Sequence, residues 1–150
     1  MSYNMSDIFD QTTEIPSRQE MYSRAVRGLA GQGWKPSYIS GTMGLTCMYR
    51  TENDHRCAWG HVDPKGTGHS GIGNTTVIGL AGQSIGLAAR LTPDDLVFAR
   101  RLQCAHDDPF TDGPVSTEKD EPAILFRAMR EFGNREGLDW PADVSTTEPS

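Results

Sequence analysis

Apolar positions recur at helical spacing in three separate stretches of the chain. The first stretch follows Ser17, which opens a Ser-x-x-Glu capping box, and the second follows Pro93, which stands directly after a threonine. The third begins near Pro122. Within each stretch an apolar residue returns every three or four positions, as on the buried face of a helix. The pattern therefore predicts three helices, over residues 18–32, 93–107 and 122–136.

A different pattern lies between the first two helices. β-favouring residues run up to Arg50, a polar Glu-Asn-Asp turn follows, and the sequence Arg-Cys-Ala-Trp then leads to Gly60. This order is typical of two strands joined by a tight turn, so it predicts an antiparallel hairpin over residues 47–60. With a three-residue loop, Cys47 and Cys57 face each other across the two strands.

These elements predict an α+β domain, in which a small antiparallel hairpin or sheet packs against about three helices. A length of 150 residues suits one domain, which we place at residues 17–141. We expect residues 1–16 to form a flexible arm and residues 142–150 a disordered tail. Residues 74–91 favour neither a strand nor short helical turns clearly, although their glycines would leave gaps in a packed strand.

Composition changes the picture mainly through charge. The formal net charge is −6, from 14 basic and 20 acidic residues. No run of basic residues is long enough to contact a nucleic-acid phosphate backbone, so we expect no nucleic-acid binding. No apolar run reaches the roughly 20 residues of a membrane-spanning helix. Three cysteines cannot all pair within one chain, and no apolar signal segment opens the sequence. We therefore expect a cytoplasmic protein.

Two kinds of chemistry suit the cysteines and histidines, and the first is a zinc site. Zinc prefers four thiolate and imidazole ligands in a tetrahedron. The chain lacks the closely spaced Cys-x-x-Cys pair that is typical of zinc modules, but a fold can bring distant ligands together. The candidate ligands for such a site are Cys47, Cys57, Cys104 and His106.

The second kind of chemistry is a thiol nucleophile. His106 and Asp107 end the predicted second helix, where the helix dipole favours a protonated imidazole. An imidazolium beside Cys57 would lower the pKa of the thiol and raise its reactivity. The alternative is purely structural, because cysteines are often buried without chemical duty and a histidine before two aspartates can simply finish a helix.

Short motifs spread from residue 47 to residue 141 resemble a group of small, largely uncharacterised phage and bacterial proteins. That group shares a Tyr-Arg pair, a polar turn, Cys-Ala-x-Gly, a helix ending near Gln-x-x-His-Asp, and a last helix closing with Gly-Leu and an aromatic-Pro pair. Here these motifs are Tyr49-Arg50, Cys57-Ala58-Trp59-Gly60, Gln103-Cys104-Ala105-His106-Asp107 and Gly137-Leu138-Asp139-Trp140-Pro141. The resemblance implies an origin in a phage or mobile element, without an activity, and draws attention to Cys57, His106 and Asp107.

The leading hypothesis from the sequence is a small accessory protein of phage type that binds a protein partner without catalysis. The first alternative is a cysteine-dependent enzyme that uses Cys57 and His106, with Asp107 as the third group. The second alternative is a zinc-stabilised binding module. These three functions differ in their response to Cys57→Ser and to a chelator. A binder keeps its affinity for the partner after Cys57→Ser, whereas an enzyme loses turnover but keeps its fold. A zinc module unfolds when a chelator removes the metal.

Overall fold

A computed structural model of the chain describes residues 15–36, 38–41, 44–47, 56–63, 86–111 and 120–149. Within these residues the chain forms four α-helices, one 3-10 helix and two short strands. In chain order they are α2 (Arg18–Gly31), β1 (Tyr38–Gly41), β2 (Gly44–Cys47), α3 (Ala58–Val62), η1 (Leu87–Arg90), α5 (Pro93–Thr111) and α6 (Glu121–Glu136).

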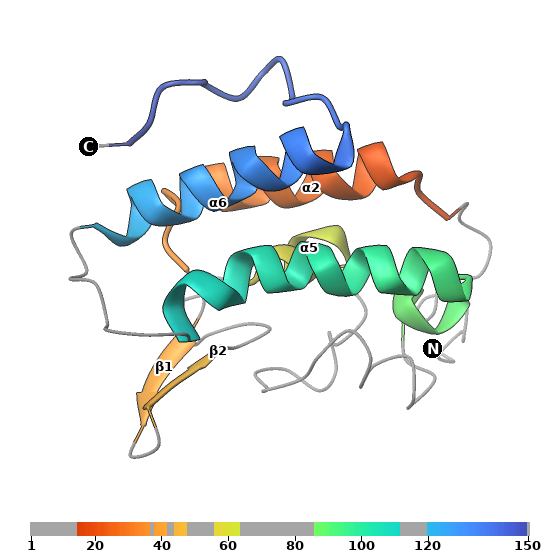
Figure 1. The fold of residues 1–150 in the computed structure, drawn as a ribbon, viewed down its shortest axis with the longest axis horizontal. Helices are drawn as coiled ribbons and strands as arrows, with labels where there is room; N and C mark the ends of the chain where they lie inside the picture. Colours follow the sequence, from red (N-terminus) through yellow and green to blue (C-terminus); the bar gives the residue numbers. More distant parts are fainter. Residues whose placement is uncertain are drawn as a thin grey trace, which may run out of the picture.

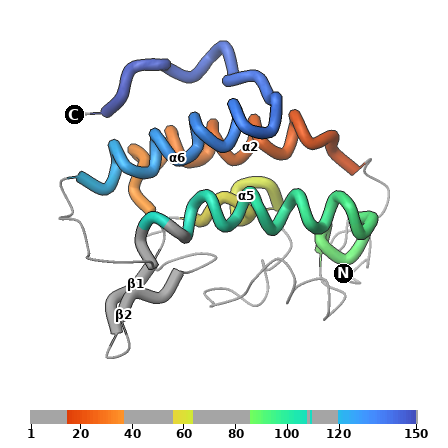
Figure 2. Tube along the Cα trace, in the orientation of Figure 1, coloured from red at the N-terminus to blue at the C-terminus, as the bar shows by residue number. Residues whose placement is uncertain are grey.

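The three long helices form the body of the domain. In Figure 1, α6 lies in front of α2, α5 lies below them, and the short helix α3 lies behind α5. The sequence colours in Figure 2 show that α5 and α6 run in opposite directions, while α2 runs the same way as α5. The chain after α6 turns back and passes along the outer side of α6 (Figure 1).

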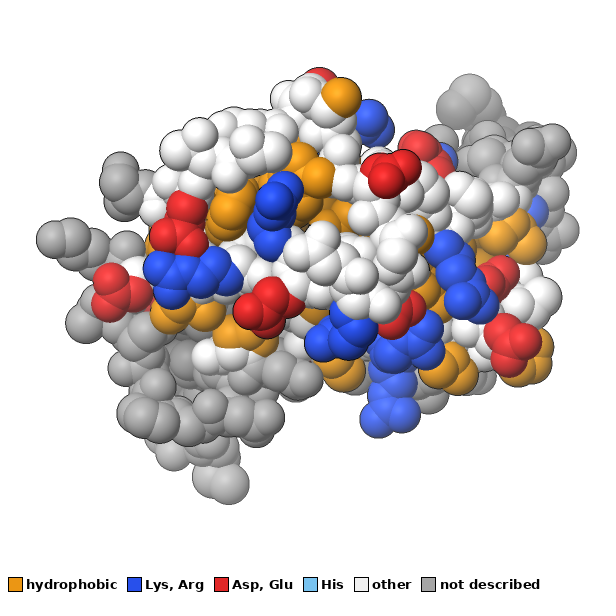
Figure 3. All heavy atoms as spheres, turned by 45° about the horizontal axis from the view of Figure 1, so that its top comes forward, with side chains coloured by type: hydrophobic (Ala, Val, Ile, Leu, Met, Phe, Trp, Pro, Cys, Tyr) orange, Lys and Arg blue, Asp and Glu red, His pale blue; other side chains and the backbone are white. Residues whose placement is uncertain are grey.

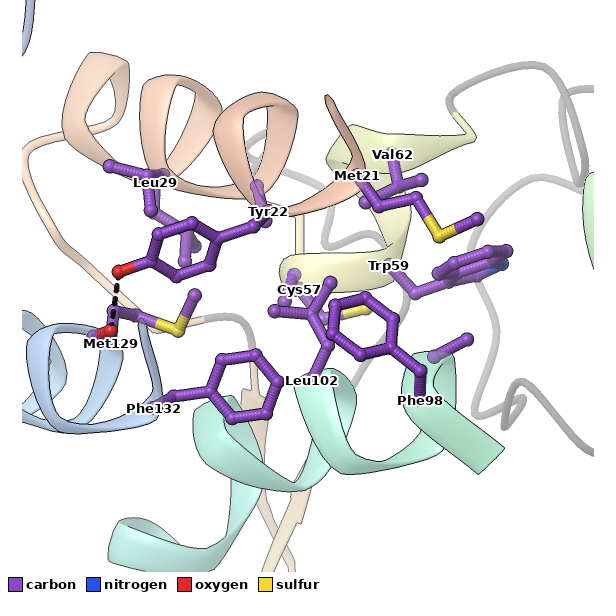
Figure 4. Packing of buried hydrophobic residues seen from close by; sticks show 14 of the residues in the cluster. Met21, Tyr22, Leu29, Cys57, Trp59, Val62, Phe98, Leu102, Met129 and Phe132 are labelled. Carbon is purple, nitrogen blue, oxygen red and sulfur yellow. Dashed lines mark hydrogen bonds between the residues drawn. The ribbon is translucent and has the colours of Figure 1, made fainter. Parts of the chain in front are cut away.

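The core lies where α2, α3, α5 and α6 meet. Tyr22, Trp59, Phe98 and Phe132 are its largest fully buried side chains, and each is at most 1% exposed. Figure 4 shows these rings together with the aliphatic and sulfur-containing side chains between them. Burying such side chains is the main stabilising term for a domain of this size.

One buried hydrogen bond joins α2 to α6 inside this core. The hydroxyl of Tyr22 donates to the carbonyl oxygen of Met129 at 2.8 Å (Figure 4). Burial raises the pKa of Tyr22 to about 12, so the phenol stays a neutral donor. The hydroxyl fits because Gly133 has no side chain: a Cβ atom at that position would lie 2.2 Å from the phenolic oxygen.

The prediction of an α+β domain is wrong. Every hydrophobic residue of the described core lies in a helix or within three residues of one. The backbones of β1 and β2 pair antiparallel with Tyr38 opposite Cys47, but two strands of four residues are too few and too short to form a layer of the domain. The described part of the chain is therefore a helical domain.

The hairpin predicted over residues 47–60 is also wrong where the structure describes it. Ala58–Val62 is helix α3, not a strand, and the partner of Cys47 across a strand pair is Tyr38, not Cys57. Tertiary packing explains the difference, because Ala58, Trp59 and Val62 are all buried against neighbouring helices. The turn predicted at residues 52–54 lies outside the described residues.

The three long helices confirm the helical pattern of the sequence. Ser17 caps α2 by accepting a hydrogen bond from the amide of Glu20 at 3.1 Å, and Gly137 closes α6 in the left-handed conformation, with φ 70°. The second helix is longer than predicted, because α5 continues past Asp107 to Thr111 with Pro109 in its last turn. A proline so close to a helix end removes only one backbone hydrogen bond.

Residues 141–149 contact the helices, whereas the sequence pattern favours a disordered tail. Arg27 of α2 donates to the carboxylate of Asp143 at 3.0 Å, and Arg127 of α6 pairs with both carboxylate oxygens of Glu148. Just before the tail, the side chain of Gln19 exchanges two hydrogen bonds of 2.8 Å with the backbone of Asp139. These partners are too distant in sequence for a local pattern to reveal them.

The close approach of α2 and α6 predicts the effect of a methyl group at Gly133. Gly133→Ala forces the Tyr22 hydroxyl to move, which weakens its bond to Met129, and overpacking of this kind costs about 1–3 kcal/mol. Urea unfolding followed by circular dichroism measures the loss. Gly31→Ala is the matched control, since nothing lies within 4 Å of a Cβ atom there, and an equal loss in the control would contradict the packing argument.

The ion pairs of the tail predict a separate response to acid. Hydrogen bonds from Arg127 and Arg27 lower the pKa of Glu148 below 4.5 and of Asp143 below 3.8, respectively. Because these pKa values are lower in the folded state, the pairs stabilise the attached tail above about pH 4 and lose this effect as the pH falls further. Carboxyl NMR titration checks this.

Two matched variants make the titration specific. Arg127→Gln should return the midpoint of Glu148 to its usual value and leave Asp143 unchanged, and Arg27→Gln should do the reverse. Usual midpoints for both carboxylates in the unaltered protein would show that the tail does not hold these contacts in solution.

Candidate functional site

The candidate nucleophile, Cys57, lies at the start of α3 with 1% of its surface exposed. Figure 4 places it among the apolar side chains of the core, near Phe98 and Leu102. Burial raises the pKa of the Cys57 thiol to about 12, and hydrogen bonds from Gly60, Gln103 and Trp59 lower it only in part. A thiol with so high a pKa is almost entirely protonated at neutral pH.

Gln103 of α5 connects Cys57 to the other two residues of the predicted triad. Its side-chain oxygen accepts from the Trp59 amide at 2.9 Å, and its side-chain nitrogen donates to Asp107 at 2.9 Å. The same carboxylate oxygen of Asp107 lies 2.7 Å from Nδ1 of His106, which is fully buried. The charge of Asp107 also raises the pKa of Cys57, so this carboxylate opposes formation of a thiolate.

The predicted environment of His106 is wrong in one respect. His106 was expected at the C-terminal end of a helix, where the dipole favours an imidazolium, but α5 runs on to Thr111. His106 therefore lies more than one turn before the helix end. Nδ1 of the buried His106 ring lies 2.7 Å from the carboxylate of the neighbouring Asp107, whose side chain is 26% exposed, so the pair lies at the edge of the core.

The predicted zinc ligands are Cys47, Cys57, Cys104 and His106. In the part of the chain that the structure describes, no group of three or more His, Cys, Asp or Glu side chains is arranged to hold a metal ion. Cys57 begins α3, whereas Cys104 lies half-buried on the side of α5 that faces α6. Cys47 is the last residue of β2, and its side chain is outside the described atoms. The zinc site stays a prediction.

Helix α3, which carries Cys57, is held in place by α2. Nε2 of His61 lies 2.8 Å from the side-chain oxygen of Gln32, which also accepts from the Arg56 amide at 3.0 Å. The ring of His61 packs so closely on Gly28 that a Cβ atom there would lie 2.1 Å from it. A segment fixed this firmly suits a structural role for its N-terminal residue, Cys57.

A second candidate site lies between α5 and α6, where an open groove of about 750 Å³ separates the helices. The lining residues follow helical spacing on both sides, so each helix contributes one continuous stripe. The stripe on α5 consists of Val97, Arg100, Arg101, Cys104, Ala105 and Pro109, and the stripe on α6 consists of Ala128, Glu131 and Arg135.

The groove combines exposed apolar surface with positive charge. Val97 is 51% exposed, and the only other exposed large hydrophobic residue in the described part of the chain is Ile15, at 41%. Arg101 pairs with Glu136 of α6 at 2.6 Å, but Arg100 and Arg135 form no ion pair with a described residue. Figure 3 shows basic, acidic and hydrophobic side chains interspersed over one face of the molecule.

The sequence did not reveal this groove. Val97 and Arg100 are exposed on α5, whereas Phe98 and Leu102 are buried in the core, and the guanidinium of Arg101 lies 5.9 Å from the centroid of the Phe98 ring. Such a charged stripe is usually a solvated helix face. The one available signal was an apolar valine within that stripe. The groove itself depends on the pairing of α5 with α6, which a pattern along either helix cannot specify.

Comparison of the chain with protein-family models, curated proteins and solved structures finds no match in any of the three. The resemblance to small phage and bacterial proteins therefore stays a prediction. Among the described helices, none has the length and apolar character needed to cross a membrane.

The burial of Cys57 predicts that iodoacetamide will not modify it in the native protein at pH 8, because the reagent needs a thiolate that it can reach. Peptide mass mapping after a short reaction measures modification at this residue, and the same reaction in denaturant is the control. Equal rates at Cys57 in the native and denatured protein would show that the thiol is accessible and active.

Proposed function

We propose that this protein is a small binding protein that recognises a protein partner through the groove between α5 and α6 and performs no catalysis there. The observation that carries the proposal is the exposed stripe of α5, where Val97 stands beside Arg100, which forms no ion pair with a described residue. Exposed apolar surface rimmed by polar groups is typical of protein interaction sites, and arginine is enriched at such interfaces.

The state of Cys57 supports this proposal over the alternative of a cysteine-dependent enzyme. A nucleophilic cysteine needs a lowered pKa and access to substrate, whereas Cys57 has a raised pKa and is buried. His106 is buried and pairs with the neighbouring Asp107, which is partly exposed. We also infer a reducing compartment, such as the cytoplasm, because Cys57 is a free thiol.

A random-peptide display selection against the purified protein tests the proposal. We expect peptides whose affinity falls at least tenfold with Val97→Asp, because this change places a charge at the exposed apolar position of the groove. Ile15→Asp is the matched control, with a comparably exposed side chain outside the groove lining, and should leave the affinity unchanged. Val97 is exposed, so the fold should persist, which circular dichroism verifies.

The same peptides distinguish the binder from the enzyme and zinc alternatives. Cys57→Ser should leave their affinity within about twofold, since the thiol lies outside the groove. Failure of the selection to yield any peptide that depends on Val97 would refute the proposed function.

A further inference from the structure

We infer that the groove between α5 and α6 takes an acidic segment of its partner that also carries an apolar anchor. This inference rests on the proposed function and adds the chemistry of the partner. The groove lining holds three arginines and one glutamate, in a protein whose net charge is −6. With Glu136, the partner of Arg101, counted beside the lining, three arginines face two glutamates, which leaves a net charge of +1 in a chain of net negative charge. Charge complementarity therefore favours a negative ligand.

The lining is polarised along the groove. Arg101 pairs with Glu136 at 2.6 Å, which brings the C-terminal end of α6 beside the first turns of α5. Because the helices are antiparallel, Arg135 lies towards the same end as Arg100, and Ala128 lies towards the end that holds Ala105 and Pro109 (Figures 1 and 2). One end of the groove thus offers guanidinium groups together with Val97, and the other offers the apolar contacts of Ala105, Pro109 and Ala128.

The spacing of these two ends sets the pattern of the ligand. Ala128 and Arg135 are seven residues apart on α6, which corresponds to about 10 Å along the helix. An extended ligand covers this distance in about three residues, and a helical ligand in about seven. The ligand should therefore place its carboxylates about 10 Å from the apolar side chain that contacts Ala128. It should carry no acidic residue opposite Glu131, which lies between Ala128 and Arg135.

The net negative charge of the protein does not prevent this recognition. At physiological ionic strength charges are largely screened beyond about 8 Å, so distant acidic residues act weakly while the arginines act at contact. Guanidinium groups bind carboxylates with two parallel hydrogen bonds. Arg100 and Arg135 have this capacity available, because neither forms an ion pair with a described residue.

A protein segment fits the groove better than a nucleic acid. Single-stranded nucleic acids stack their bases on aromatic side chains, and the groove lining contains none. A long polyanion would also reach beyond the arginines to the rest of a chain with 20 acidic residues. A short acidic segment with one apolar anchor avoids both difficulties.

Three single substitutions and the composition of the selected peptides test the inference. The displayed peptides that depend on Val97 should be enriched in Asp and Glu. Their affinity, measured by fluorescence anisotropy at low salt, should fall about fivefold or more with Arg100→Glu, because reversing a charge converts attraction into repulsion. Glu131→Gln should raise the affinity, since it removes the one acidic residue of the lining.

Lys35→Glu is the matched control for Arg100→Glu. It changes the net charge by the same amount at an exposed position outside the groove lining, so it should leave the affinity nearly unchanged. Added salt should weaken binding to the unaltered protein and have less effect on the Arg100→Glu variant.

The remaining outcomes separate the inference from the proposed function. Peptides that need Val97 but are neutral or basic, or are indifferent to Arg100→Glu, would overturn the acidic partner and leave protein binding standing. The absence of any peptide that depends on Val97 would overturn both. Tighter binding of single-stranded DNA than of the peptides, or self-association that Val97→Asp abolishes in analytical ultracentrifugation, would replace the acidic segment by that occupant.

Discussion

The hydrogen bond from Tyr22 to the Met129 carbonyl is the constraint on which the helical arrangement depends. A buried hydroxyl without a partner is costly, so the phenol must reach a backbone acceptor on the opposite helix. That reach requires α2 and α6 to approach closely, and Gly133 supplies the space. With these helices fixed, α5 packs against both α2 and α6, and α3 fills the remaining side of the core.

The local features of the fold could be predicted from the sequence, and the non-local ones could not. Ser17 and Gly137 define helix ends through bonds to residues a few positions away, so a local pattern is sufficient to locate α2 and α6. Trp59 favours a strand by itself and is helical because other helices bury it. The burial of His106, and the groove beside Val97, likewise depend on contacts between elements that are distant along the chain.

The structure also shows why a cysteine near a histidine and an acid need not be reactive. The start of a helix and hydrogen bonds from Gly60 and Gln103 favour the thiolate of Cys57, but complete burial outweighs them. Asp107 adds a negative charge nearby, which opposes a second one. The polar groups around Cys57 thus join α3 to α5.

The contacts between α2 and the end of the chain have a consequence for folding during synthesis. Gln19 bonds to Asp139, 120 residues later, and Arg27 pairs with Asp143, 116 residues later. During synthesis α2 is made before these partners, which follow it by more than 100 residues. Native packing of α2 must therefore wait until those later residues have been made, and contacts of such long range favour slow folding.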